Sequence, residues 1–479
     1  MACMQAIARL RICRPRSFKA VVFQHRPFSA STTPTPADII NEPIDEELLP
    51  GDRLKYFHPT HPGDILDDRF KVIVKMGFGS GSTVWLAENL QFWKIWRRPS
   101  VGRFVCIKIP ALDANISDET ERSKHISSAN PSHDGLSFIR TPIDDFKLQG
   151  PQGTHSCLVY EPMRESLLYF RTRSPQEMLT VPLGKMYIFF ILKAVDYLHT
   201  ECRLIHTGNL FSYLSSIRTD SLTLDIKDDN ILITIENDAV LTDYVDYHKN
   251  NPQPRHVRAE DGRVVYLSQD EFGPPKGNYI LPKLADFNLS FPGLPEGRGH
   301  LSPIQSHRYR APEVLLGCPW SYSVDIWNVG LMMWDLLENV SPFGRPVDDD
   351  GEYDTHVHLA RMISLLGDPP EELVRRERIY RNAQLRLMVN PQGKECKTMN
   401  EFWGGPFFDH DNQPFRKDLV TDKKLADTVT QLDGVEKEQF LDMAISMLQW
   451  LPEKRKTAKE LLYHPFLEEI RKNDEQYGH

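Results

Sequence analysis

The pattern of hydrophobic and polar residues changes along this chain. Between Phe70 and Met163, short apolar and β-branched runs are separated by glycine, proline or polar stretches, which is typical of β-strands. These runs are FKVIVKM, STVWLAE, RFVCIKI and HSCLVYEPM. We therefore expect a small unit that consists mainly of strands.

From Lys185 onward, apolar residues recur with the spacing of amphipathic helices. The clearest segments are KMYIFFILKAVDYLHT, VDIWNVGLMMWDLLEN, VHLARMISLLG and KEQFLDMAISMLQWL. Strands followed by helices favour an α+β fold. We expect two lobes, a small β-rich N-lobe at residues 64–163 and a large α-helical C-lobe at residues 164–470, with a ligand cleft between them.

The ends of the chain have a different composition. Residues 1–37 contain arginine, serine and threonine but no acidic residue, which predicts a mitochondrial transit peptide; a disordered basic leader is the alternative. Residues 38–63 are rich in Pro, Asp and Glu and are expected to form a linker. Residues 471–479 are expected to form a tail.

Composition narrows the classes of function. A formal net charge of -9 provides no basic surface for nucleic acid and suits a basic partner. The seven cysteines are scattered without a CxxC pair, which argues against a disulfide framework or a zinc site. The apolar stretches are too short and too interrupted to cross a membrane.

A glycine-rich segment, GFGSGSTV from Gly77 to Val84, lies between two predicted strands, where backbone amides can approach a polyphosphate. Such a segment alone is more often a plain turn. Lys108, in the next strand, can reach the phosphates. Glu119, in the segment SDETERSKHI, can hold Lys108 in an ion pair, with Glu121 as the alternative.

The segment DIKDDNILI, residues 225–233, combines groups that suit phosphoryl transfer. Asp225 can accept the proton of a hydroxyl group, Lys227 can bind the transferring phosphate, and Asn230 can bind magnesium. Asp286, in KLADFNLS, follows an apolar strand and can bridge the metal to the phosphates. Each motif alone could be a polar turn, but their fixed order makes a chance match negligible.

Further motifs suggest structural contacts. Glu313, in HRYRAPEVLLG, is expected to pair with Arg455. Asp325, in SVDIWNVG, is expected to bind backbone amides of the catalytic loop, the loop that carries DIKDDNILI. A surface position would be the alternative for each of these charges.

Together these motifs resemble the protein kinases, and in detail the SR-protein kinases, which phosphorylate serine in Arg/Ser-rich splicing factors. The resemblance covers about residues 56–467 and includes YFHPTHPGDILDDRF, DDFKLQGPQGTHSCLVYEPM and IQSHRYRAPEVL. It implies the two-lobed protein kinase fold, ATP and Mg²⁺ as cofactors, an Arg/Ser-rich protein substrate and a monomer. It also implies the cytoplasm or nucleus, whereas the leader predicts the mitochondrion.

The resemblance also implies the remaining site residues. The glycine loop would cover the nucleotide with Gly77, Gly79, Ser82 and Val84. Ser82 replaces the third glycine of the family pattern. Backbone groups of Glu161 and Met163 would bind adenine. Lys227 in the DIKxDN pattern is similar to serine/threonine kinases rather than tyrosine kinases.

The chain departs from the family pattern at several positions. Thr207 replaces the arginine that reads a phosphorylated activation loop, so activation by such phosphorylation is not expected. Asn288 replaces the glycine of the DFG motif, and Asn tolerates positive φ well. Residues 236–279 correspond to the spacer of the SR-protein kinases.

The largest departure is the segment 208–224, which separates His206-Thr207 from Asp225 where the family has an unbroken HTD. Removing it restores HTDIKDDNILI, which favours a retained intron. A misplaced Asp225 would catalyse poorly. The alternative function is therefore a pseudokinase scaffold that binds nucleotide or partners without catalysis.

Overall fold

The structure is a computed structural model of the chain. It describes residues 39–92, 101–114, 117–174, 176–207, 226–277, 280–385 and 387–477. The predicted transit peptide, the segment 208–224 and Asp225 lie outside the described residues. Among the helices of these described ranges, none is both long and apolar enough to cross a membrane.

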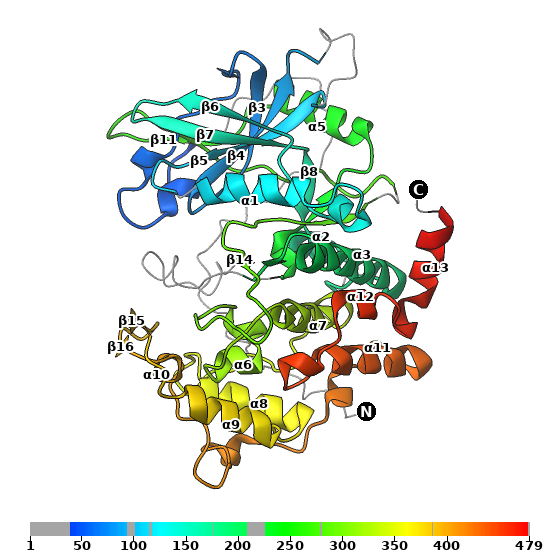
Figure 1. Cartoon of the computed structure of the whole chain (residues 1–479). Coiled ribbons are helices and arrows are strands. Elements are labelled where there is room, and N and C mark those ends of the chain that lie inside the picture. The colour runs from blue at the N-terminus through cyan, green and yellow to red at the C-terminus, as the bar shows by residue number, and fades with distance from the viewer. Residues whose placement is uncertain are drawn as a thin grey trace, which may run out of the picture.

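The N-lobe contains a six-stranded antiparallel sheet, at the top of Figure 1. The strands lie in the order β2 (Ile65–Leu66), β3 (Phe70–Gly79), β4 (Ser82–Asn89), β5 (Phe104–Pro110), β7 (Thr154–Tyr160) and β6 (Asp144–Gln149). The four predicted strand runs are confirmed. The apolar pattern misses β6, because its DDFKLQ sequence is mostly polar and lies at the sheet edge.

Side chains along a strand alternate between the two faces of this sheet, and this alternation decides the face on which Lys108 lies. On β5, Val105 and Ile107 pack into one apolar cluster, while Cys106 belongs to the cluster on the opposite face. Lys108 follows Cys106 by two residues and therefore shares its face. Helix α1 (Ser117–Ser128) lies against the sheet (Figure 1).

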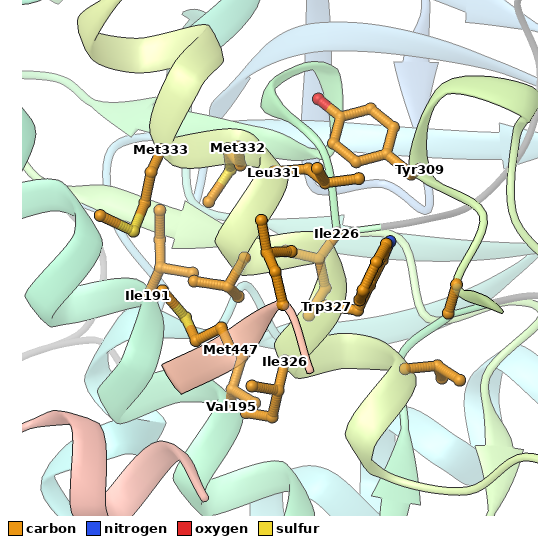
Figure 2. Close-up of a cluster of buried hydrophobic side chains, with 14 of the residues drawn as sticks. Ile191, Val195, Ile226, Tyr309, Ile326, Trp327, Leu331, Met332, Met333 and Met447 are labelled. Atoms are coloured by element: carbon orange, nitrogen blue, oxygen red, sulfur yellow. The ribbon is translucent and has the colours of Figure 1, made fainter. Parts of the chain in front are cut away.

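The C-lobe is helical and has a large apolar core. The predicted helices are confirmed as α3 (Val181–Thr200), α7 (Ser323–Leu337), α8 (Thr355–Leu366) and α11 (Gly434–Met447). Figure 2 shows side chains of α3, α7 and α11 meeting in this core, including Val195, Trp327 and Met447. Further helices are α2 (Leu167–Thr172), α6 (Pro312–Leu315), α9 (Glu371–Tyr380), α10 (Met399–Phe402) and α12 (Ala458–Leu461).

Short strands position the segments that carry the motifs. A three-stranded sheet contains β13 (Pro282–Leu284), β10 (Ile231–Thr234) and β8 (Met163–Ser166). Strand β10 follows Asn230 directly, and β13 ends shortly before Asp286. A second pairing joins β9 (Leu204–Ile205) to β14 (Phe291–Pro292).

The predicted linker at residues 38–63 is wrong, since residues 39–63 belong to the folded N-lobe. Strand β1 (Ile39–Ile40) pairs in parallel with β11 (Arg255–Val257). Lys75 on β3 is fully buried, and its Nζ lies 2.9 Å from Oδ2 of Asp45 and also bonds Glu46. Because a buried cation needs such partners, the acidic composition that suggested a linker is instead structural.

The placement of the spacer 236–279 in the C-lobe is also wrong. Helix α5 (Asp238–Asn250) packs against the N-lobe sheet, where Tyr244 joins the cluster that contains Val74 and Leu86. Strand β12 (Val264–Tyr266) pairs with β11. Apolar burial therefore attaches the spacer to the N-lobe.

The predicted tail at residues 471–479 is largely helical. Helix α13 (Glu468–Tyr477) lies beside α3, where Lys193 forms an ion pair with Asp474 at 2.5 Å. This ion pair and an apolar contact of Ile470 with the C-lobe core hold the helix in place.

Candidate active site

A cavity of about 400 Å³ lies between the two lobes. It is lined by seven of the predicted site residues: Gly77, Val84, Lys108, Glu119, Met163, Asn230 and Asp286. Gly79 and Ser82 are paired at the end of the β3–β4 hairpin, beyond the cavity lining. The lining also excludes Glu161 and Lys227.

Lys108 and Glu119 form the expected ion pair. Nζ of Lys108 lies 2.6 Å from Oε1 of Glu119, and both side chains are largely buried. Burial opposes the charge of Lys108, but the carboxylates of Glu119 and Asp286 and the phenol of Tyr160 outweigh it and raise the lysine pKa above its usual value. Lys108 therefore stays cationic, as its predicted role in binding phosphate requires.

Asp286 and Asn230 approach the cavity from the C-lobe. Asp286 has a left-handed backbone, with φ of 61°. The N–H of Ala285 donates to the carbonyl of Asn230 at 2.9 Å, which links the two segments. Burial raises the pKa of Asp286, Lys108 lowers it, and the nearby Glu119 raises it further.

These two residues fit a magnesium ion. Oδ1 of Asp286 is buried and has no hydrogen-bond partner in the described part of the chain. Mg²⁺ prefers oxygen ligands, and kinase sites typically use one or two side chains together with phosphates and water. Among the described residues, no cluster of three or more His, Cys, Asp or Glu side chains forms a metal cage.

A buried carboxylate anchors one end of the catalytic loop. Asp325 of α7 accepts hydrogen bonds from the backbone N–H of His206 at 2.8 Å and of Thr207 at 3.0 Å. His199 lies 2.9 Å from the same carboxylate. The expected contact of Asp325 with the catalytic loop is therefore confirmed.

The other end of the loop is anchored as well. Ile226 is fully buried in the C-lobe core, where Figure 2 shows it near Trp327. Asp228 accepts from Arg171 at 2.7 Å, and Lys227 pairs with Asp229 at 2.8 Å. The described residues on both sides of the segment 208–225 thus have fixed positions.

Of the two residues that are predicted to bind adenine, one is buried and one is exposed. Met163 is buried in β8 and lines the cavity. Glu161 is exposed, and its carboxylate pairs with Lys283 at 3.2 Å. Only the backbone of Glu161 is expected to bind adenine, so this exposure is compatible with the predicted role.

The sequence motifs miss other residues that line the cavity, among them Tyr160, Arg140 and Asp270. Tyr160 directly precedes Glu161, one of the two residues whose backbone is expected to bind adenine, so its position in the predicted strand is a usable signal. Asp270 lies in the spacer, and its position depends on how the spacer packs on the N-lobe.

A further predicted ion pair stabilises the C-lobe. Arg455 donates to both carboxylate oxygens of Glu313, at 2.7 and 2.6 Å, and both side chains are almost fully buried. This pair is confirmed, and the surface alternative for these charges is wrong.

The fold and the cleft define a protein kinase. Residues 70–467 match the family model described as the protein kinase domain, and the chain belongs to this family. A crystal structure of a kinase domain matches with a TM-score of 0.53 and 21% identity, covering 86% of this chain and 99% of that one. This structural likeness supports the fold alone.

The relatives are serine/threonine kinases. One from Aspergillus fumigatus is 31% identical over 88% of this chain and 91% of its own length. The kinase SRPK of Physarum polycephalum is 26% identical over 86% of this chain and 89% of its own length. Human SRSF protein kinase 3 is 32% identical over 43% of this chain and 33% of its own length. The resemblance to the SR-protein kinases is therefore confirmed, and the pseudokinase alternative gains no support.

Proposed function

We propose that the protein transfers the γ-phosphate of ATP to serine or threonine in Arg/Ser-rich proteins. The observation that carries the proposal is the Lys108–Glu119 ion pair, which lies in one cavity with Asp286 and Asn230. A cation held at the phosphates and oxygen ligands for the metal are the parts that phosphoryl transfer needs.

The chain's own residues have distinct roles in this proposal. Lys108 binds and orients the nucleotide phosphates, and Lys227 binds the transferring phosphate. Asp225 accepts the proton of the substrate hydroxyl. Asp286 and Asn230 would hold Mg²⁺, which neutralises phosphate charge when it is bound.

Charge supports the proposed substrate class. The formal net charge is -9, and an exposed C-lobe loop contains Asp348, Asp349, Asp350 and Glu352. A basic peptide would be attracted to this surface. One relative is named for SRSF proteins and another is named SRPK.

The test is transfer of labelled phosphate from Mg-ATP to peptides of alternating Arg and Ser, with Lys-Ser and Glu-Ser peptides for comparison. We expect the Arg-Ser peptide to be preferred, and Lys108→Met to lower kcat/KM at least about a hundredfold. Lys124→Met, at an exposed position of α1, is the matched control and should be neutral. Equal rates for Lys108→Met and wild type would contradict the proposal.

A further inference from the structure

Tyr160 of β7 lines the cavity and contacts Glu119 of α1. It is the last residue of β7, its backbone pairs with Cys106 on β5, and the residue is 6% exposed. Its hydroxyl donates to Oε1 of Glu119 at 3.3 Å. The same oxygen accepts from Nζ of Lys108 at 2.6 Å. One carboxylate oxygen on α1 is thus bound from two neighbouring strands.

Helix α1 has little apolar packing of its own. Its sequence, SDETERSKHISS, contains one aliphatic residue, Ile126, which lies about two turns beyond Glu119. Ile126 is fully buried and anchors the carboxyl-terminal half of the helix. The first turn has no Leu, Ile, Val or Met, so the position of Glu119 depends on polar contacts.

From these contacts we propose that Tyr160 is a positioning residue for the Lys108–Glu119 pair. The strand fixes the phenol, the phenol holds the carboxylate, and the carboxylate holds the lysine at the nucleotide phosphates. The proposal rests on the kinase function proposed above and adds to it a residue that acts through Glu119.

The Arg140 side chain lies over the face of the Tyr160 ring. Its guanidinium carbon lies 4.4 Å from the centroid of the Tyr160 ring and lines the same cavity. The backbone N–H of Arg140 donates to the carbonyl of Leu284 at 2.8 Å, and this hydrogen bond fixes the position of the Arg140 backbone. A cation over an aromatic face attracts the ring. Burial raises the pKa of Tyr160 to about 12, so the hydroxyl remains a donor at neutral pH.

The test is a double-mutant cycle on the full chain. Tyr160→Phe keeps the ring and removes only the hydroxyl. We expect kcat/KM for ATP to fall about three- to tenfold, as for one lost hydrogen bond. Added to Glu119→Ala, the same substitution should cause no further loss, because the acceptor is already absent.

Tyr187→Phe is the matched control. The Tyr187 hydroxyl is buried in the C-lobe and donates to the carbonyl of Ile280 at 3.2 Å. Its removal should lower the melting temperature without changing kcat/KM. If Tyr160→Phe lowers kcat/KM equally with and without Glu119, or not at all, the positioning role is overturned.

Affinity for a fluorescent ATP analogue with Mg²⁺, measured on the same variants, separates this proposal from the proposed function. If the chain binds nucleotide but transfers no phosphate, the kinase function fails, while coupling between Tyr160 and Glu119 in Kd would still support positioning. A wild-type chain that binds no nucleotide overturns both proposals.

Arg140→Met tests the second part of the arrangement. We expect about a twofold loss in kcat/KM, smaller than for Tyr160→Phe, because packing still restrains the ring. An unchanged kcat/KM would overturn the role of Arg140 and leave that of the hydroxyl intact.

Discussion

Helices α1 and α7 both position the active site, but different forces hold them. Every residue of α7 from Val324 to Leu337 is buried, and Asp325 reaches the catalytic loop from within this core. Helix α1 is polar, and contacts such as that of Glu119 with Lys108 set its place. Apolar burial therefore fixes α7 beside the cleft, and hydrogen bonds and charge fix α1.

This difference predicts different consequences of mutation. A polar group removed from α7 leaves buried partners unpaired, which costs folding free energy. When a polar contact of α1 is removed, the remaining partner lies near the open cleft, where a water molecule can replace the lost hydrogen bond. Changes around α7 should reduce stability, and changes around α1 should mainly reduce activity.

Asp325→Asn should have the largest effect on stability. The carboxylate is fully buried and accepts from His206, Thr207 and His199. We expect the free energy of unfolding to fall by about 3 kcal/mol, measured by urea denaturation.

The control for this substitution is Asp442→Asn. Asp442 pairs with His464 at 3.0 Å, but its side chain is 74% exposed. The His464 side chain is buried, but water already solvates the Asp442 carboxylate, so we expect a change below about 0.5 kcal/mol. Similar losses at both positions would show that burial does not distinguish the two aspartates.

Deletion of residues 208–224 tests whether the C-lobe already holds both ends of the catalytic loop in place. Thr207 and Ile226 are anchored on either side, so the deletion should join ends that the C-lobe holds. We expect phosphate transfer to rise about a hundredfold, since small displacements of a catalytic group cost this much.

A Gly/Ser replacement of the same length is the control for the deletion. It should stay slow if the added length, rather than the composition of the segment, is what impairs catalysis by Asp225. Equal activity with and without the segment would show that it does not disturb the loop. Sequencing the mature transcript across these codons tests the retained-intron hypothesis separately.

Arg122→Gln tests the polar attachment of α1. The Arg122 side chain donates to the carbonyl of Asn288, directly beyond Asp286 and Phe287. We expect about a fivefold lower kcat/KM, as for one lost hydrogen bond, with little change in melting temperature. Lys124→Gln is the matched control. The Lys124 side chain is 68% exposed, and its ion pair with Asp145 is long, at 3.7 Å. If Lys124→Gln causes an equal loss, the contact with Asn288 is not the cause.

The sequence predicted the parts of the site that have fixed spacing or a charge that must be paired. Lys108 and Glu119 meet because their strand and helix are joined by a short connection. Asp325 could be assigned to the catalytic loop because a carboxylate inside an apolar helix needs donors. Asp225, at the centre of the proposed mechanism, stays a prediction.

The sequence failed where the partner was distant. The composition of the acidic segment near Glu46 predicts a linker, because its partner Lys75 lies far along the chain in β3 and a second acceptor of Lys75, the carbonyl of Tyr266, lies in the spacer. No local pattern reveals such a cluster. The motifs miss Tyr160 for a different reason: its position beside Glu161 is a signal, but an aromatic residue at the end of a strand is most often part of the core.

Helix α5 provides a third case beside α1 and α7. It belongs to the N-lobe, as α1 does, but apolar burial holds it in place, as it holds α7. His248 lies against Tyr244, with ring centroids 4.4 Å apart, and its Nδ1 is buried without a hydrogen-bond partner among the described residues. Burial lowers the pKa of His248 to about 4. Its unfolded imidazole takes up a proton near pH 6.5.

Between these two pKa values the unfolded chain binds more protons, so stability is lost as the pH falls. We expect His248 to contribute a loss of about 2 kcal/mol between about pH 7 and about pH 5. His248→Phe should reduce the pH dependence of the free energy of unfolding by this amount. His410→Phe, at a side chain that is 90% exposed, should leave it unchanged. An unaltered pH dependence in His248→Phe would mean that α5 admits water, and that burial does not hold the spacer on the sheet.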